Sequence, residues 1–150
     1  MQKHILIKLS AFLLMLSGVA GCATTTRIDV VSRESRAPVH TVYLVVHGGS
    51  SSDVDDDVRR ALLHRGFSET EGTDDTIQNK NVDLVVKYDD HWTWDLTMYL
   101  RSIDIELFDG KTGSLVAESS WQNSAFHRFP NAGDVVDDLV NQTFDKIDSK

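Results

Sequence analysis

The sequence predicts an α+β fold, a two-layer α/β sandwich in which a mixed, mainly antiparallel sheet of about four or five strands carries two helices on one face. Two observations predict this architecture. Runs of apolar and β-branched residues with strand character occur in four places, at 41–47, 82–91, 99–108 and 115–122. Apolar residues recur at helical spacing in two further segments, at 52–66 and 134–147.

Residues 1–21 have the features of a signal peptide. Two lysines make the start basic, and the apolar run at 9–20 is too short to span a bilayer. The run ends in Val19-Ala20-Gly21-Cys22, which resembles the processing box of bacterial lipoproteins. This resemblance implies cleavage between Gly21 and Cys22, followed by fatty acylation of the thiol and of the new amino group of Cys22.

Residues 22–40 are predicted to form the lipidated cysteine and a tether, and residues 41–150 a single α/β domain. The tether is polar, and Pro38 interrupts strand pairing in it. About seventeen flexible residues reach at most roughly 60 Å, so the acylated Cys22 would hold the domain near its membrane. Within the tether, the run Ile28–Val31 has the composition of a short edge strand.

The first strand and the first helix of the domain are marked by their residue types. Residues 41–47 are β-branched and nearly all apolar, which is typical of a buried strand. The helix predicted over 52–66 has acidic residues in its first turn and basic residues later, as the helix dipole favours. An apolar stripe runs along one side of this helix, and Gly66 supplies a stop.

Three further strands and a closing helix follow a polar segment. Residues 69–81 are rich in turn formers and are predicted as a loop, with a short strand near Phe67 left open. The strands at 99–108 and 115–122 are predicted to pair antiparallel through a hairpin, and regular alternation leaves one face of the first in water. The apolar stripe of 134–147 predicts a helix that covers the sheet.

Aromatic residues near the end of the strand at 82–91 are the best functional lead. Tyr88, Trp92 and Trp94 would share one face of an extended strand. If exposed, they could stack on sugar rings or contact a protein, and if buried they belong to the core; both interpretations stay open. The candidate binding residues are Tyr88, Asp89, Asp90, His91, Trp92 and Trp94.

Catalytic and metal-binding motifs are weak in this sequence. His47-Gly48-Gly49 after a strand is similar to the oxyanion segment of esterases, but no G-x-S-x-G nucleophile motif accompanies it. The glycines are therefore predicted to form a turn between strand and helix. The histidines show no metal-ligand spacing. We expect no catalytic residue, no metal site and no cofactor, and therefore no enzyme.

The charge balance limits the partners. The chain has 15 basic and 23 acidic residues, a net charge of −8, and removal of the two lysines of the signal peptide makes the mature chain more acidic still. An acidic surface disfavours nucleic acid and direct adhesion to anionic lipids. Membrane attachment is therefore expected to come from Cys22 alone.

Four segments, together with Cys22 in its box, resemble a family of small proteobacterial outer-membrane lipoproteins: 41–47, 61–67, 82–88 and 105–117. The order of elements is also similar to the amino-terminal α/β module of TolB and to the curli secretion lipoprotein. These resemblances imply a fold and a place in the cell envelope, and they carry no catalytic residue across. Ala23, where an aspartate would favour the inner membrane, implies outer-membrane delivery facing the periplasm.

The leading hypothesis is a lipid-anchored, non-enzymatic domain that faces the periplasm and binds another envelope protein or helps an assembly to form. The alternative is a module for glycan, peptidoglycan or a divalent ion, which would use the aromatic and acidic candidate residues around His91. A hydrolase with chemistry near His47 is the weakest of the three interpretations.

Overall fold

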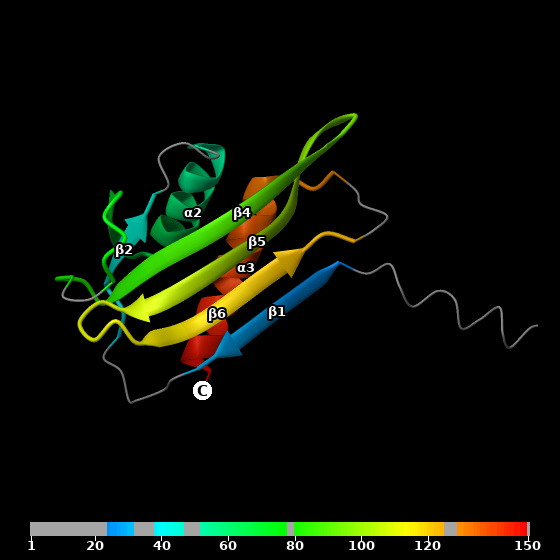
Figure 1. Ribbon diagram of the computed structural model, residues 1–150. Coiled ribbons are helices and arrows are strands. Elements are labelled where there is room, and N and C mark those ends of the chain that lie inside the picture. Colours follow the sequence, from blue (N-terminus) through cyan, green and yellow to red (C-terminus); the bar gives the residue numbers. More distant parts are fainter. Residues whose placement is uncertain (1–23, 32–37, 47–51, 78–79, 125–128, 150) are drawn as a thin grey trace, which may run out of the picture.

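The computed structural model describes residues 24–31, 38–46, 52–77, 80–124 and 129–149 of the 150-residue chain. Figure 1 shows a strongly twisted sheet with both helices packed against one face. None of the helices in these ranges is long and apolar enough to cross a membrane. The elements are β1 Thr25–Val30, β2 Thr41–Val45, α2 Ser52–His64, β3 Ser68–Gly72, β4 Leu84–Asp95, β5 Thr97–Asp109, β6 Leu115–Gln122 and α3 Ala132–Asp148.

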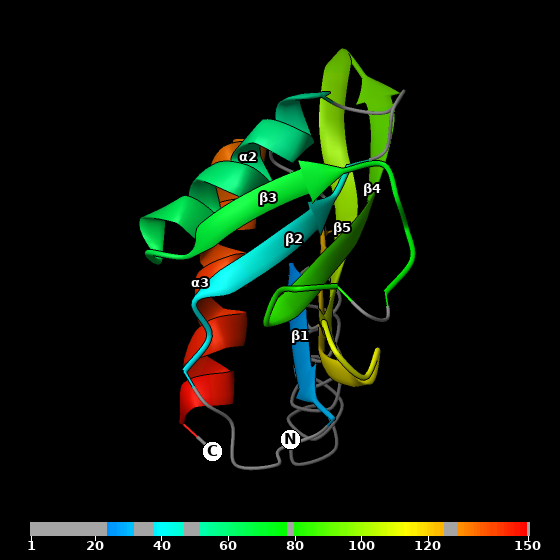
Figure 2. The same cartoon turned by 90° about the vertical axis from the view of Figure 1, so that its left-hand side faces the viewer.

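The six strands form one mixed sheet in the order β1-β6-β5-β4-β2-β3. The pairs β1–β6, β6–β5 and β5–β4 are antiparallel, whereas β4–β2 and β2–β3 are parallel. Figure 2 shows α2 and α3 side by side on the same side of this sheet. The predicted α+β class with two helices on one face is thus confirmed. The predicted count of four or five strands was too low, and the pairing is more evenly mixed than expected.

The two strands behind this difference are β1 and β3, which lie at the two edges of the sheet. β3 begins directly after Phe67, where a short strand was left open, and continues into the segment predicted as a polar loop; its residues are mostly exposed. It pairs with β2 on one side, and Arg59 of α2 forms an ion pair with Glu71 of β3. An edge strand of this kind needs no apolar alternation, because only one of its edges is paired and its side chains remain in water.

β1 begins earlier than the sequence suggested. Only Ile28–Val31 had strand composition, yet pairing with β6 runs from Thr25 opposite Gln122 to Val30 opposite Ala117. Ile28 and Val30 pack against the core, and the Lys146 ammonium of α3 donates to the Ile28 carbonyl. Residues Thr25–Val30, which lie within the predicted tether, are therefore part of the sheet.

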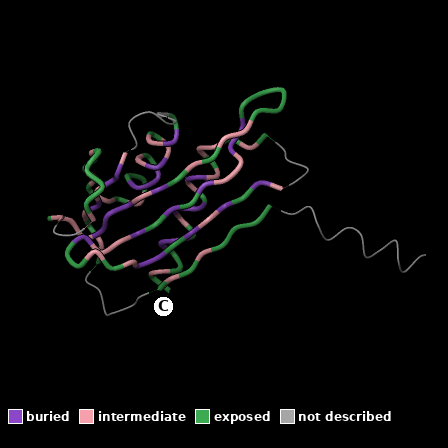
Figure 3. Tube along the Cα trace, in the orientation of Figure 1, coloured by how far each residue is buried: buried purple, intermediate pink, exposed green. Residues whose placement is uncertain are grey.

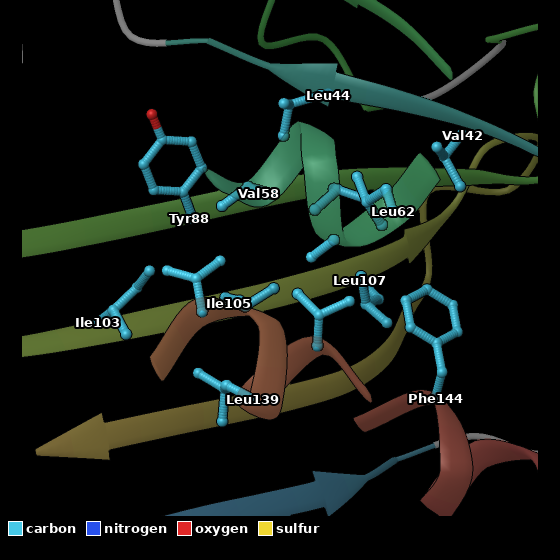
Figure 4. Packing of buried hydrophobic residues seen from close by; sticks show 14 of the residues in the cluster. Val42, Leu44, Val58, Leu62, Tyr88, Ile103, Ile105, Leu107, Leu139 and Phe144 are labelled. Carbon is cyan, nitrogen blue, oxygen red and sulfur yellow. The ribbon is translucent and has the colours of Figure 1, made fainter. Parts of the chain in front are cut away.

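One hydrophobic core lies between the sheet and the two helices (Figure 4). Alternate residues of β4, β5 and β6 point into it, as do the apolar stripes of both helices. Phe67 and Phe144 meet with ring centroids 4.7 Å apart, which closes the core at one end. Fully buried members with large side chains include Leu44, Leu62, Leu84, Leu100, Ile103, Ile105, Leu107 and Leu139.

β4 and β5 are longer than their neighbours and form a hairpin that extends past the sheet (Figure 1). The sequence predicted β4 to end at His91 and β5 to start at Tyr99, but pairing continues to Asp95 opposite Thr97. The register shifts at His91/Trp92, so the outer part of the hairpin begins with a β-bulge. Leu96 makes the turn with a φ of 60°.

Candidate functional site

The sheet face away from the helices is polar and acidic. Strand alternation buries Tyr88 and Ile105 toward the helices and places Asp89, Asp104 and Glu106 on the opposite face. Cross-strand pairing sets Asp104 opposite Asp89. A shallow hollow of about 430 Å³ over this face is lined by Lys87, Tyr88, Asp89, Asp104, Glu106 and Glu118.

Carboxylates face one another across the strands of this hollow. Glu106 of β5 lies opposite Glu118 of β6 and, on its other side, opposite Lys87 of β4. Partial burial raises the pKa of Asp104 above its ordinary value, and the nearby charges of Asp89 and Glu118 raise it further. Like charges in opposite positions repel, so the carboxylates of this face destabilise one another. A cationic group placed between them would reduce this repulsion.

The aromatic candidates do not form one platform. Tyr88 is buried in the core, as the core interpretation expected, and its hydroxyl donates to the Asp55 carboxylate of α2. Burial raises the pKa of Tyr88, and the hydrogen bond to Asp55 raises it further. Trp92 is half-buried against the core, and its Nε1 donates to Asp90 Oδ2 at 2.6 Å.

The acidic and imidazole candidates are divided between the two faces of β4. Asp89 and His91 lie on the uncovered face, whereas Asp90 shares the helix-side face with Tyr88 and Trp92. In the described part of the chain, no three His, Cys, Asp or Glu side chains are placed to hold a metal ion. The six candidate residues are therefore not brought together into one site.

The end of the β4–β5 hairpin exposes large apolar side chains. Trp94 is 70% exposed, Leu96 84% and Met98 54%. Figure 3 shows this end as a continuous exposed loop beyond the buried strands. We call Trp94, Leu96 and Met98 the hairpin tip. Next to Met98, the ring of Tyr99 meets the ring of Phe129 edge to face, with centroids 5.5 Å apart.

Sequence reasoning found Trp94 but missed Leu96 and Met98. A signal was present, because apolar residues alternate with polar ones from Trp92 to Met98. That pattern is typical of a strand with one apolar face, but it continues through the turn, beyond the part of the hairpin that α2 and α3 cover. The contact between Phe129 and Tyr99 joins segments that are distant along the chain, so no local sequence pattern indicates it.

The remaining predicted site residues lie outside the described residues. These are Gly21 and Cys22 of the processing box and the segment His47-Gly48-Gly49. The first described residue is Thr24, two positions after Cys22.

Comparisons with known proteins identify the fold through solved structures. The chain matches no family model and no curated protein. It is similar to PelC from Paraburkholderia phytofirmans, a dodecamer, with a TM-score of 0.56 at 12% identity over 81% of this chain and 96% of PelC. A second PelC dodecamer, a variant, gives a TM-score of 0.57 at 12% identity over 85% of this chain and 100% of PelC.

Two matches from Acinetobacter baumannii are more distant. TolB matches with a TM-score of 0.46 at 15% identity, over 81% of this chain and 31% of TolB. A minor lipoprotein matches with a TM-score of 0.40 at 14% identity, over 76% of this chain and 94% of the lipoprotein. The predicted likeness to TolB and to envelope lipoproteins thus recurs among the structural neighbours. At these identities the PelC likeness shows the fold alone, and the two weaker matches carry no argument about function.

Proposed function

We propose that this protein is a lipid-anchored protein of the outer membrane that faces the periplasm and acts by binding another envelope protein, without catalysis. The box at 19–22 supports the anchor, because it joins a basic start and a short apolar run to a cysteine. Three acyl chains hold far more firmly than one, which binds only marginally.

The position of β1 is the observation that carries this proposal. β1 starts three residues after Cys22 and pairs with β6 along its whole length. An acyl group on Cys22 would therefore be attached close to a strand of the sheet, without a long flexible segment between them. The domain would lie directly on the membrane, with a defined end of the sheet turned toward it.

The uncovered sheet face supports the binding role. Its carboxylates, among them Asp89, Asp104, Glu106 and Glu118, present an acidic surface on the side of the sheet away from α2 and α3. A partner with Lys or Arg side chains would relieve the repulsion between them. PelC is a dodecamer, which makes a second copy of this chain another candidate, but two such acidic faces would repel each other.

The test is photo-crosslinking in intact cells that carry the full chain. A photoreactive residue replaces Ser120, which lies opposite Asp104 on the uncovered face. The matched control position is Gln142, an exposed residue of α3. We expect position 120 to capture one identified envelope protein, position 142 not to capture it, and Glu106→Gln with Glu118→Gln to reduce the capture.

The same cells carrying Cys22→Ser test the anchor. We expect the protein to leave the membrane fraction or stay unprocessed, and the capture to fall, because the domain no longer lies at the membrane. A processed Cys22→Ser form that remains in the membrane fraction would contradict the lipid anchor. Equal capture from positions 120 and 142 would contradict the binding face, and crosslinks between copies alone would replace the partner with self-assembly.

A further inference from the structure

Exposed apolar side chains are concentrated at the β4–β5 hairpin. Among the described residues, six large hydrophobic side chains are exposed, and three of them are Trp94, Leu96 and Met98 of the hairpin tip. A fourth, Phe129, lies beside the base of the hairpin through its contact with Tyr99. Scattered exposed hydrophobics are ordinary, but a cluster at one projecting end marks a contact surface.

Leu96 is an unusual residue for the turn of this hairpin. Its φ of 60° is the left-handed conformation that glycine and asparagine adopt readily and leucine does not. Its side chain is 84% exposed, so no packing within the described residues compensates for the strain. A strained, exposed leucine at the turn of a projecting hairpin indicates a role outside the domain itself.

The tip and the start of β1 lie at the same end of the sheet. Pairing connects Thr25 to Gln122, Gln122 to Ser102 and Ser102 to His91 in one row across four strands. Both Figure 1 and Figure 2 show β1 beginning at the end from which the hairpin projects. From His91 to the turn at Leu96 the hairpin extends five residues, which is about 16 Å.

The hairpin is longer than the link that joins Cys22 to β1. Cys22 precedes Thr25 by three residues, so it lies at most about 10 Å from the row. The hairpin extends further than this from the same row. If the acyl chains of Cys22 are in a membrane, the hairpin is long enough for its tip to reach the surface of that membrane.

We propose that the hairpin tip enters the lipid surface that holds the acylated Cys22, giving the protein a second point of membrane contact. This inference rests on the proposed lipid anchor. Trp is suited to the headgroup region, and Leu and Met to the outer part of the acyl chains. Asp95 lies within the tip, and the chain is acidic, so the surface that it enters is one of neutral, zwitterionic headgroups.

The test places a fluorescent label at the tip of the full, acylated chain. Acylation would block the thiol of Cys22, the chain's only cysteine, so an introduced cysteine is the one site for a thiol-reactive dye. Thr97→Cys puts the dye between Leu96 and Met98. Lys111→Cys, in the β5–β6 connection at the opposite end of the sheet, is the matched control. Both proteins are reconstituted into phosphatidylcholine vesicles that contain nitroxide-carrying lipids.

We expect the nitroxide lipids to quench the dye at position 97 and to leave the dye at position 111 unchanged. Trp94→Ser with Leu96→Ser should remove the quenching at 97, while the protein stays on the vesicles through its acyl chains. Both side chains are exposed, so this double variant should fold like the wild type.

Two results would overturn the inference, and they are distinguishable. An acylated, vesicle-bound protein whose dye at position 97 is no more quenched than at 111 would overturn tip insertion alone and leave the anchor intact. It would indicate that the hairpin tip contacts a protein and not a lipid surface. A mature protein whose mass shows no acyl group on Cys22 would overturn both the anchor and the inference that rests on it.

Discussion

Asp83 joins β2 to its parallel neighbour β4 at the start of both strands. One of its carboxylate oxygens accepts hydrogen bonds from the backbone N–H groups of His40 and Thr41 and from Thr41 Oγ1, each at 2.9 Å. In return, the Asp83 N–H donates to Thr41 Oγ1 at 3.0 Å. The hydrogen bonds from His40 and Thr41 lower the pKa of Asp83 below its ordinary value. This one side chain therefore fixes the register between β2 and β4.

Replacing Asp83 should destabilise the fold. We expect Asp83→Ala to lower the free energy of unfolding by about 1–3 kcal/mol, because several donors lose a charged acceptor. Since the pKa of Asp83 is lower in the folded state, its contribution is present at neutral pH and is lost as the pH falls below about 4. Urea unfolding at pH 7 and at acid pH measures both effects.

The matched control for Asp83 is Asp74→Ala. Asp74 is a solvent-exposed carboxylate that pairs with Lys80 at 2.5 Å, and water screens such a pair. We expect its removal to leave the unfolding midpoint nearly unchanged at either pH. Equal losses from the two variants would contradict the role assigned to Asp83, as would an Asp83→Ala loss that persists undiminished at acid pH.

At the scale of elements, the sequence predicted the helices and strands that have one buried face and one exposed face. β6 has the predicted bounds, and α3 was placed within two residues at each end, because an apolar stripe or an alternating face must meet the core. The edge strands β1 and β3 were predicted only in part, as a short strand at Ile28–Val31 and an open possibility near Phe67, because their side chains are mostly exposed. Their strand geometry comes from pairing with β6 and β2, which are distant from β1 and β3 along the chain.

The candidate site was predictable only in part for the same reason. Parity along β4 correctly placed Tyr88, Trp92 and Trp94 on one face. It could not tell that the helices cover only the first part of that face, so that Tyr88 is buried and Trp94 exposed. The acidic hollow arises from cross-strand pairs such as Glu106 and Glu118, and single-strand patterns do not contain their register.

The acidic sheet face should cost the fold stability at neutral pH. We expect Asp104→Asn to raise the free energy of unfolding by about 0.5 kcal/mol at pH 7, because Asp104 lies opposite Asp89 and near Glu118. Since the pKa of Asp104 is raised in the fold, the penalty exists only while the carboxylate is ionised, and the gain should disappear as the pH falls toward 4.

Thermal unfolding of both proteins across this pH range measures the effect. Asp138→Asn, an exposed carboxylate of α3 that accepts from Gln142 at 2.7 Å, is the control and should give no such gain. If Asp104→Asn instead lowers the melting temperature at pH 7, the carboxylates of this face are not under repulsion, and the case for a cationic partner weakens.

At the scale of the whole molecule, two features would restrict how the domain lies on a membrane if the proposed anchor holds it there. The link between Cys22 and β1 is only two residues long, and the hairpin tip projects from the same end of the sheet. If Cys22 is acylated and the tip enters the lipid, two contacts some distance apart would prevent the tilting that one flexible attachment allows. Together they would turn the acidic sheet face to the side, where a partner on the same membrane can reach it.

Lengthening the link should release this orientation. We expect a ten-residue Gly/Ser segment inserted between Ala23 and Thr24 to leave acylation and membrane binding intact but to let the domain rotate more freely, because such a segment spans about 17 Å and lowers the effective concentration of the tip at the lipid. Anisotropy decay of a dye at Lys111→Cys on vesicles measures the rotation.

Adding Trp94→Ser and Leu96→Ser to the lengthened link should increase the rotation further than either change alone. The same segment inserted between Thr73 and Asp74, away from the anchor, should have no effect; equal rotation in all these proteins would show that the domain was never held.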